Sequence, residues 1–268
     1  MPTDPKSVQS RWAEEATVAL APLGLGPVEW VRETGSTNAD LLAIAATGAP
    51  AGRVLVTDHQ TAGRGRRERT WVTAPGDALL VSVLLRPRLP ADRLGLTTAA
   101  LGVAAVDGCH RLGFDQVRLK WPNDLVVGDP PRRRKLAGIL AQSHVDTSGA
   151  AVVVGMGLNV IGDRLDQPDA IALGDLGSPP ARLELLVAIL SQLPGLLDLA
   201  ATDDAEALWA RYRSVSATLG TTVRCQLEDD VVVGRAVDIA PDGALLVEAA
   251  GELRKIVTGD VISVRTPG

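Results

Sequence analysis

The chain has 268 residues, of which 46% are hydrophobic, 22% charged and only 3% aromatic, and its formal net charge is −5. This length suits one large domain or a large and a small one, and the apolar content is ample for a core. The acidic balance argues against the global positive field that draws proteins to nucleic acids or anionic membranes. The distant cysteines, Cys109 and Cys225, argue against a disulfide framework or a CxxC zinc site.

The N-terminal region carries no secretory leader pattern, because Asp4, Arg11, Glu14 and Glu15 interrupt any apolar stretch. The longest strongly apolar run, residues 78–85, is too short to span a bilayer. We therefore expect a soluble, cytoplasmic protein that does not use a membrane.

The hydrophobic pattern predicts a helix over 7–21, a strand over 28–33 and a helix from Ser36 or Thr37 to about Thr47, where Thr37 and Asp40 have the spacing of a capping box. The run 78–86 predicts a strand that is buried on both faces. The other elements expected before residue 217 are strands over 53–58, 117–119, 125–127, 136–142 and 152–160, and helices over 90–112, 181–199 and 203–214.

After Gly220 the pattern changes to short β-rich pieces separated by turn signals such as Pro241-Asp242-Gly243. The predicted strands cover 222–227, 231–238, 244–248, 253–257 and 261–265, which favours a small barrel. We therefore expect two domains, 1–218 and 219–268. The second holds five basic and eight acidic residues and no aromatic residue, so it lacks the basic groove and stacking rings of single-strand binders. A docking or capping role is expected for it.

The segment 59–71, here called the arginine loop, concentrates positive charge in this acidic chain. It holds four arginines and one acid, Glu68, so its net charge is +3 and that of the remainder is −5 − 3 = −8. Its glycines, Gly63 and Gly65, make the segment flexible. The loop could bind nucleic acid, bind a phosphate ligand, or be a solvated surface.

Other polar segments also lie between apolar strands, and each alone has a plain structural interpretation. Ser36 and Thr37 could cap a helix, and Asn159 could end a strand. Lys120 and Asp124 could form a surface ion pair that contributes little to stability.

Together and in this order, the segments resemble the biotin protein ligases. The matching motifs are Gly-Ser-Thr-Asn at 35–38, Gln-x-Ala-Gly-Arg-Gly-Arg at 60–66, Lys-Trp-Pro-Asn-Asp at 120–124, Lys-Leu-Ala-Gly-Ile-Leu at 135–140 and Gly-x-Gly-Leu-Asn-Val at 155–160. The resemblance covers roughly residues 30 to 265. It implies an α+β fold, in which a mixed β-sheet backed by helices forms a biotin/lipoate ligase-like catalytic domain, followed by a small C-terminal SH3-like β-barrel.

The resemblance also implies a reaction. The family couples biotin and ATP, with Mg²⁺, to biotinyl-5′-AMP and then transfers biotin to one lysine of a biotin carboxyl carrier domain of a carboxylase. Biotin carboxylate and ATP are both anions, so fixed positive charge in a dry site is needed to offset their repulsion. Guanidinium groups suit carboxylate and phosphate oxygens.

By resemblance, the catalytic residues are Lys135, which reaches the carboxylate and α-phosphate, Arg69, and Asp124, which orients the incoming lysine amine or takes its proton. The expected biotin-binding residues are Ser36, Thr37, Asn38, Gln60, Gly63, Arg64, Gly65, Arg66, Lys135 and Gly138. The expected ATP and adenylate residues are Arg69, Trp71, Lys120, Asn123 and Asn159, with Mg²⁺ near Asn123 rather than in a protein metal cluster.

The sequence also departs from the family pattern. Too few residues precede the first motif for the winged helix-turn-helix of some members, so we expect a monofunctional ligase that does not repress transcription or bind nucleic acid. Glu68 stands where a small residue is common, and the basic stretch Arg132-Arg133-Arg134 could contact a carrier or be a solvated turn. The roles of both stay open, and we expect a monomer or weak homodimer.

Three other functions remain as alternatives: a lipoate–protein ligase of the same fold, a ligand-responsive nucleic-acid-binding regulator that uses the arginine loop, and an inactive binding module.

Overall fold

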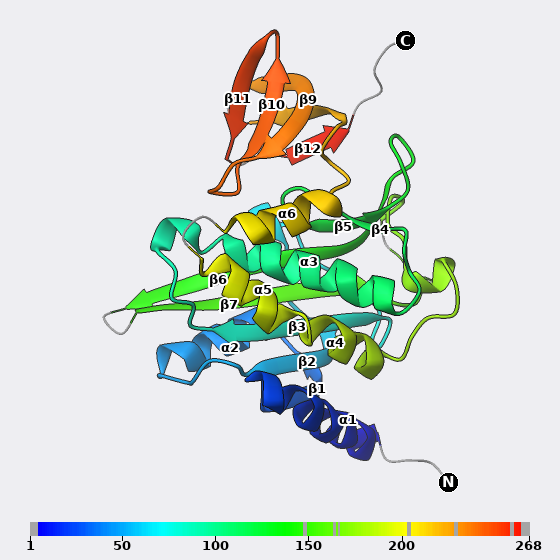
Figure 1. Ribbon diagram of the computed structural model, residues 1–268. Coiled ribbons are helices and arrows are strands. Elements are labelled where there is room, and N and C mark those ends of the chain that lie inside the picture. Colours follow the sequence, from blue (N-terminus) through cyan, green and yellow to red (C-terminus); the bar gives the residue numbers. More distant parts are fainter. Residues whose placement is uncertain are drawn as a thin grey trace.

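The computed structural model describes residues 5–146, 149–162, 165, 167–202, 205–227, 230–257 and 260–263. It contains a seven-stranded sheet with helices packed against it and a separate five-stranded sheet that sits over one end of the first (Figure 1). The helices are α1 (Pro5–Leu20), α2 (Thr37–Ala46), α3 (Leu96–Arg111), α4 (Arg182–Leu190), α5 (Leu193–Ala200) and α6 (Glu206–Ser214), with short 3₁₀ turns at Ala21–Leu23, Arg66–Glu68, Ala91–Arg93 and Leu173–Asp175.

The large sheet has the strand order β1-β2-β3-β7-β6-β5-β4. Its strands are β1 (Val28–Thr34), β2 (Val54–Gln60), β3 (Ala78–Leu85), β4 (Val117–Lys120), β5 (Asp124–Val127), β6 (Arg134–Asp146) and β7 (Gly149–Asn159). The β1–β2 pair is parallel and the other pairs are antiparallel, so the sheet is mixed. The predicted α+β class, with a mixed sheet backed by helices, is confirmed.

The middle of the large sheet is covered on both faces, as the run of apolar residues in β3 predicts. All eight residues of β3 are buried. Val81 and Val83 belong to the main core, which α3 and α4 cover, whereas Leu84 belongs to a smaller cluster with Leu41 of α2. Because side chains alternate across a strand, Ser82 lies on the face that α2 covers. That face becomes important for the site.

Arg182 connects α4 to the first strands of this sheet. Its guanidinium lies 5.5 and 5.4 Å from the ring centres of Trp12 and Trp30 and forms an ion pair with Asp58 at 2.8 Å. Trp30 also donates its indole N–H to Asp58 at 3.0 Å. These contacts fix the end of β2, two residues before Gln60 enters the site.

Some sequence predictions were wrong in detail. The capping box of Thr37 and Asp40 does not form: Ser36 is the N-cap of α2 and makes no side-chain capping bond, and the Thr37 hydroxyl bonds across to the sheet instead. The helix expected over 181–199 is two helices, since Pro194 has no N–H to continue the ladder from α4. The helix expected from Pro90 begins only at Leu96.

The α4–α5 segment is apolar enough, by composition alone, to resemble a membrane span. It is broken between Leu190 and Leu193, and both halves pack against α3. Such a segment is the core of a folded domain rather than a continuous spanning helix.

The second sheet contains all five strands that the sequence predicts beyond Gly220. Its order is β11-β10-β9-β8-β12, and every pair is antiparallel. The strands are β8 (Thr222–Gln226), β9 (Val231–Ile239), β10 (Leu245–Ala249), β11 (Glu252–Ile256) and β12 (Asp260–Ser263). The C-terminal part is therefore a small antiparallel β unit.

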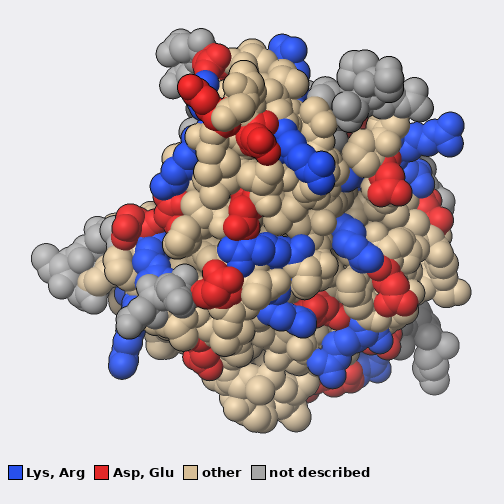
Figure 2. All heavy atoms as spheres, turned by 45° about the horizontal axis from the view of Figure 1, so that its top comes forward, with Lys and Arg blue, Asp and Glu red and all other residues tan. Residues whose placement is uncertain are grey.

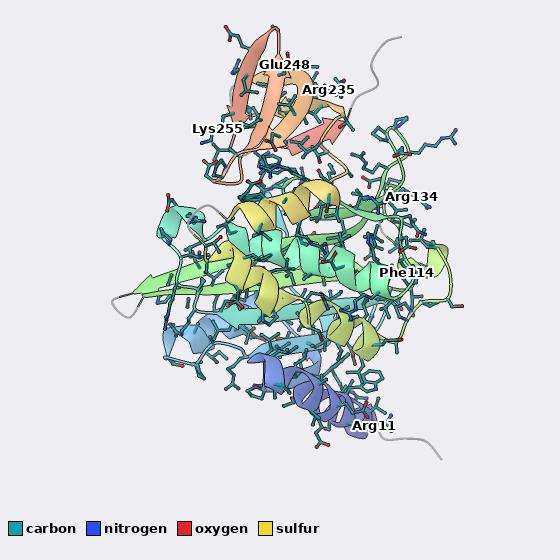
Figure 3. All side chains as sticks on the ribbon, viewed as in Figure 1. Arg11, Phe114, Arg134, Arg235, Glu248 and Lys255 are labelled. Carbon is teal, nitrogen blue, oxygen red and sulfur yellow. The ribbon has the colours of Figure 1, made fainter. Side chains whose placement is uncertain are left out.

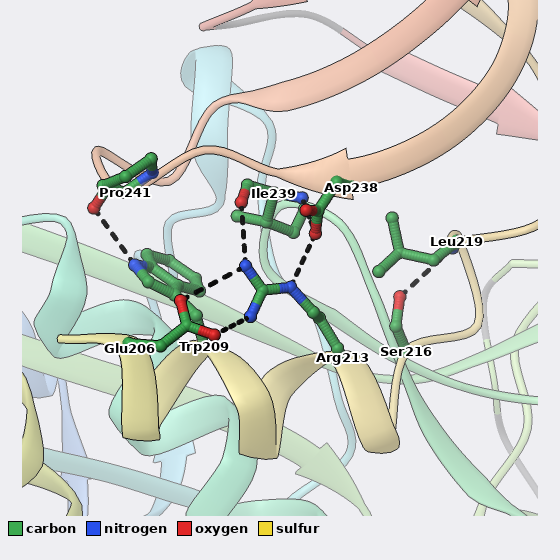
Figure 4. A network of polar contacts seen from close by, with 8 residues as sticks. All are labelled: Glu206, Trp209, Arg213, Ser216, Leu219, Asp238, Ile239 and Pro241. Carbon is green, nitrogen blue, oxygen red and sulfur yellow. Dashed lines mark hydrogen bonds and ion pairs between the residues drawn. The ribbon is translucent and has the colours of Figure 1, made fainter. Parts of the chain in front are cut away.

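The two sheets are joined by polar contacts around α6 and the turn before β10 (Figure 4). Trp209 donates its indole N–H to the Pro241 carbonyl at 3.0 Å. Trp121, from the turn after β4, donates its indole N–H to the Gly243 carbonyl at 2.9 Å. The Arg213 guanidinium donates to Asp238 at 2.6 Å and to the Ile239 carbonyl at 3.3 Å. The turn 241–243 is thus held by two tryptophans.

Both cysteines are buried free thiols, as expected for a chain without a disulfide framework. Burial raises the pKa of the Cys109 thiol to about 12 and that of Cys225 to about 11. Thiols of this kind stay protonated and unreactive at neutral pH.

The Arg213 contacts predict a specific effect on stability. Arg213→Ala removes charge-assisted hydrogen bonds between α6 and β9, and we expect the free energy of unfolding to fall by about 1.5–3 kcal/mol. Arg211→Ala is the matched control on the same helix, because Arg211 is half exposed and forms an ion pair with Asp107; its expected cost is about 0–1 kcal/mol. Urea denaturation measures both, and equal losses would contradict the role of Arg213.

Candidate active site

A cavity of about 540 Å³ opens on the large sheet between α2, the arginine loop and the ends of β4 to β7. Its size is typical of pockets that enclose a small molecule. Most of the residues predicted for the site line it: Ser36, Thr37, Asn38, Gln60, Arg64, Gly65, Arg66, Arg69, Trp71, Lys120, Asn123, Asp124, Lys135 and Gly138.

One end of the cavity is a buried hydrogen-bonding pocket under the start of α2. Ser36, Thr37 and Asn38 are each at most 6% exposed. The Thr37 backbone N–H donates to Gln60 Oε1 at 2.9 Å, and its hydroxyl lies 2.7 Å from Ser82 Oγ. The pocket is therefore assembled from α2, β2 and β3.

The directions of these hydrogen bonds are fixed by the oxygen atoms that can only accept. Asn38 Nδ2 donates to the Leu140 carbonyl at 3.1 Å, so Asn38 Oδ1 can only accept from Ser82, 2.6 Å away. Ser82 has one hydroxyl proton and gives it to Asn38, so it can only accept from Thr37, and Gln60 Oε1 is a second acceptor 3.1 Å from the Thr37 hydroxyl. The one proton of Thr37 is used within the pocket in either case. The Thr37 oxygen can then only accept a hydrogen bond from the cavity side. Gln60, whose Oε1 takes the Thr37 N–H, turns its amide nitrogen to the other side as a donor.

Ser82 was not among the predicted site residues, although the sequence contains a signal for it. It is the one hydroxyl residue in the apolar run 78–85, which the pattern already predicts to be buried on both faces. A buried hydroxyl needs hydrogen-bond partners, so such a residue indicates a polar contact in the core.

The floor of the cavity is built from glycines that face one another across β6 and β7. Gly138 pairs with Gly157, and Gly155 follows on the same face. A Cβ atom at Gly155 would overlap Asn38 Oδ1 and lie 2.7 Å from Ser82 Oγ, and one at Gly157 would lie 2.5 Å from the Trp71 ring. No side chain other than glycine leaves room here, so these positions allow the closest approach to the sheet.

Lys135 stands at the centre of the cavity. Its Nζ lies 2.7 Å from Asp124 Oδ1 and 5.8 Å from the centre of the Trp71 ring. A backbone segment also holds the residue: the Lys135 N–H donates to the Asp169 carbonyl at 2.7 Å, and the Ile171 N–H donates back to Lys135 at 2.9 Å. The ammonium is thus fixed over the glycine floor.

The arginine loop is tied to the turn between β4 and β5. Arg66 donates to Asn123 Oδ1 at 3.1 Å, and Asn123 Nδ2 donates to the Ile139 carbonyl at 2.6 Å. At the base of the loop, the Trp71 N–H donates to the Gly63 carbonyl at 3.0 Å. Gly63 itself is buried outside the cavity, where a Cβ would overlap the Trp71 carbonyl. It shapes the loop that holds Trp71.

The cavity has a strong positive balance. Its lining contains seven cationic side chains and two carboxylates, which gives a formal charge of 7 − 2 = +5 in a chain of net charge −5. The cations are Arg64, Arg66, Arg67, Arg69, Lys120, Arg133 and Lys135, and the acids are Asp124 and Asp169. Burial lowers the pKa of Lys120; Asp124 acts to raise it, and Lys135 and Arg133 lower it further.

Several lining residues had no sequence signal. Gln167 and Asp169 come from the segment after β7 that pairs with Lys135, and Val261 comes from β12 of the second sheet. Tertiary packing alone brings these positions to the cavity.

Two of the predicted site residues, Gly63 and Asn159, do not line the cavity. Asn159 is 4% exposed, donates its amide to the Ile171 carbonyl at 3.1 Å and is not part of the lining. The Glu68 side chain lies outside what the structure describes. Within the described ranges, no group of three or more His, Cys, Asp or Glu residues could hold a metal ion.

Comparisons with known proteins agree with this architecture. Residues 30–159 match the biotin/lipoate A/B protein ligase family, and residues 218–263 match the biotin protein ligase C terminal domain. The biotin–[acetyl-CoA-carboxylase] ligase of Mycobacterium tuberculosis is 38% identical over 90% of this chain and 91% of its own length. The bifunctional ligase/repressor BirA of Escherichia coli is 31% identical over 78% of this chain and 66% of its own.

A solved structure shares the fold. The biotin protein ligase from Aquifex aeolicus in complex with biotin and ATP has a TM-score of 0.75 and 24% sequence identity, and the match covers 89% of this chain and 99% of that one.

The glycine floor predicts that adding a methyl group lowers the free energy of unfolding at some glycines and not at others. Gly155→Ala inserts a methyl group into the Asn38–Ser82 contact, and we expect about 1–3 kcal/mol of destabilisation from overpacking. The control is Gly35→Ala, in the same pocket region, where a Cβ meets nothing within 4 Å; it should stay within about 0.5 kcal/mol of the wild type. Denaturant unfolding of the two variants is the measurement, and a Gly155 variant as stable as the control would show that the floor has spare room.

Proposed function

The chain belongs to the biotin protein ligase family, and we propose that its cavity binds biotin and ATP, joins them as biotinyl-5′-AMP and passes the biotinyl group to a lysine of a carrier domain. One observation carries this proposal: a neutral hydrogen-bonding pocket and a strongly cationic region meet at Lys135 within one cavity. Biotin has the same two parts, a neutral ureido ring and a carboxylate.

The hydrogen-bond directions favour biotin over lipoate. The Thr37 oxygen can accept only, which suits a ureido N–H, and Gln60 presents a donor, which suits the ureido carbonyl. The dithiolane ring of lipoate has no N–H and would leave the Thr37 oxygen buried without a partner, at a cost of about 1–3 kcal/mol. Ser36, Asn38 and Ser82 also line the cavity, and Asn38 and Ser82 in addition constrain the direction of the Thr37 hydroxyl.

The glycine floor suits the rest of biotin. Gly138, Gly155 and Gly157 all line the cavity, and their missing side chains let Asn38, Lys135 and the Trp71 ring lie close to the sheet. The apolar chain of biotin lies along this wall and the Trp71 ring. Gly65, in the arginine loop, also lines this cavity. Biotin's carboxylate then reaches Lys135 at the end of this floor.

In the first step a carboxylate oxygen attacks the α-phosphorus, a new P–O bond forms, and the bond to the β-phosphate oxygen breaks as pyrophosphate leaves. Lys135 neutralises charge on the two anions as they approach. Arg64, Arg66 and Arg69 bind carboxylate or phosphate oxygens through their planar forks. Alignment of two bound reactants accounts for about 7–11 kcal/mol of barrier reduction in favourable cases.

The nucleotide lies on the side of Lys120 and Asn123, with the Trp71 ring shaping the site. When bound, Mg²⁺ would neutralise phosphate oxygens, and it needs only one or two protein carboxylates for this. Asp169 and Asp124 in the lining are the groups that fit, near Asn123 as the sequence predicts. Asn159 supports this side indirectly through its bond to the segment that holds Lys135.

In the second step the lysine amine of the carrier attacks the biotinyl carbonyl and AMP leaves. Asp124 is the acceptor in the cavity for the amine proton, because its carboxylate already lies 2.7 Å from Lys135 Nζ at the reacting end. An oxygen that holds one ammonium in place can also orient a second amine.

We propose that the chain divides into a catalytic domain, 1–218, and a C-terminal domain, 219–268, which contributes Val261 to the cavity wall. The partner is the carrier domain of a carboxylase, and the protein acts as a cytoplasmic monomer or weak homodimer. A nucleic-acid regulator fits less well, since basic and acidic side chains are interspersed on the face that Figure 2 draws.

Pyrophosphate exchange tests the proposed function. The purified chain should incorporate labelled pyrophosphate into ATP when biotin is present, because adenylate formation is reversible. Lipoate at the same concentration should give little exchange, for the hydrogen-bonding reason above. Exchange driven by lipoate and not by biotin would contradict the proposal.

Lys135 should be essential to the first step. We expect Lys135→Ala to slow biotin-dependent exchange by about 10²–10³-fold, the loss typical of removing one transition-state charge partner. Circular dichroism should show an unchanged fold. The neighbouring exposed residue supplies the control: Arg134→Ala should keep near-normal exchange, and a Lys135 variant that does the same would remove Lys135 from its role.

A further inference from the structure

The loop between β5 and β6, residues 128–133, leads into a run of three arginines that the family resemblance does not explain. Arg132 and Arg134 are exposed, whereas Arg133 is half-buried and lines the cavity together with Pro130 and Pro131. Figure 3 labels Arg134, where the loop enters β6. The three neighbours therefore have different surroundings, and only the middle one faces the ligand site.

The local backbone directs Arg133 into this position. The Arg132 N–H donates to the Asp129 carbonyl at 2.9 Å, which closes a turn, and Gly128 takes a left-handed conformation at φ 85°. Arg133 Nε donates to the Gly128 carbonyl at 3.4 Å, so its side chain folds back over the loop. The guanidinium reaches the cavity as part of a built turn.

Arg133 faces other cations there. Lys120 and Lys135 line the same cavity, and the effects of Arg133 and Lys135 on Lys120 place all three within electrostatic reach. Burial lowers the pKa of both Lys120 and Arg133, because each cation loses hydration, while Asp124 and Asp169 act to raise that of Lys120 and Asp129 that of Arg133. Desolvated like charges that converge on one cavity are stabilised by a bound anion.

The order of strands in the sheet indicates which anion this is. Gln60 ends β2, which lies on one side of β6 and its Lys135, whereas Lys120 ends β4, at the opposite edge of the sheet. The β5–β6 loop belongs to that second side. Our proposed function puts the α-phosphate at Lys135, so the β- and γ-phosphates extend beyond it.

We propose that Arg133, together with Lys120, binds the β- and γ-phosphates of ATP and holds the departing pyrophosphate. This proposal rests on the proposed function. When the bond between the α-phosphorus and the bridging oxygen breaks, its electron pair stays with pyrophosphate, and Arg133 neutralises the charge that develops there. A planar guanidinium can bind two of these oxygens at once, which a lysine cannot.

Substitution within the arginine run tests this assignment, because the chain supplies its own controls. The assay is biotin-dependent exchange, with the KM for pyrophosphate, ATP and biotin measured separately. We expect Arg133→Ala to raise the KM for pyrophosphate and ATP by about 10- to 100-fold, the loss typical of hydrogen bonds to charged groups. The KM for biotin should change by less than about twofold, because Arg133 lies away from the neutral pocket.

The control variant Arg132→Ala removes the same charge from the same loop and should leave all three constants within about twofold of wild type. Arg133→Lys should recover part of the loss, since it keeps the charge and loses the planar guanidinium.

An unchanged KM for pyrophosphate in Arg133→Ala would overturn the assignment, as would an equal rise in Arg132→Ala. A rise in the KM for the carrier alone, measured separately by transfer of biotin to a carrier domain, would overturn the assignment and make Arg133 a carrier contact. If the wild-type chain shows no biotin-driven exchange, the proposed function itself fails.

Discussion

The repulsion between a biotin carboxylate and the phosphates of ATP is the constraint on which the arrangement of this site depends. The protein places seven cations and two carboxylates around one cavity while the whole chain stays at −5. The positive charge is local because the ligand is small, so the rest of the surface remains acidic and mixed. The arginine loop of residues 59–71 is therefore understood as one wall of an anion site.

The other end of the cavity has no charged side chain. It selects the ligand by the directions of its hydrogen bonds instead of by charge. One fixed acceptor, Asn38 Oδ1, sets the proton of Ser82, and Ser82 and Gln60 Oε1 accept the proton of Thr37. The glycines of β6 and β7 make room for these side chains and for the ligand. Hydrogen-bond direction at this end depends on a chain of side chains, so the pocket is sensitive to changes at Asn38 and Ser82.

The sequence predicted the order of elements well, because apolar runs such as 78–86 and turn signals such as Pro241–Gly243 act locally. It also predicted that Lys135 and the arginine loop belong to one site, and both line the cavity, since they occur in contiguous motifs. It could not predict Asp169 or Val261 in the lining, because each arrives through tertiary packing from a segment with no pattern of its own. Arg133 belongs to a basic stretch that the sequence singles out, but the pattern alone did not place it in the cavity. The capping box failed for the same reason: the sheet offered the Thr37 hydroxyl a buried partner.

Calorimetric titration with biotin and with its neutral primary amide tests the central claim most directly, because the two ligands share the ring and differ in charge. If the cavity's positive charge acts on the ligand, biotin should bind at least about tenfold more tightly than the amide at low ionic strength, the gain expected of a charge-assisted contact. Added salt should narrow that difference, because mobile ions screen partly exposed charges. Equal affinities for the two ligands at every salt concentration would contradict the account.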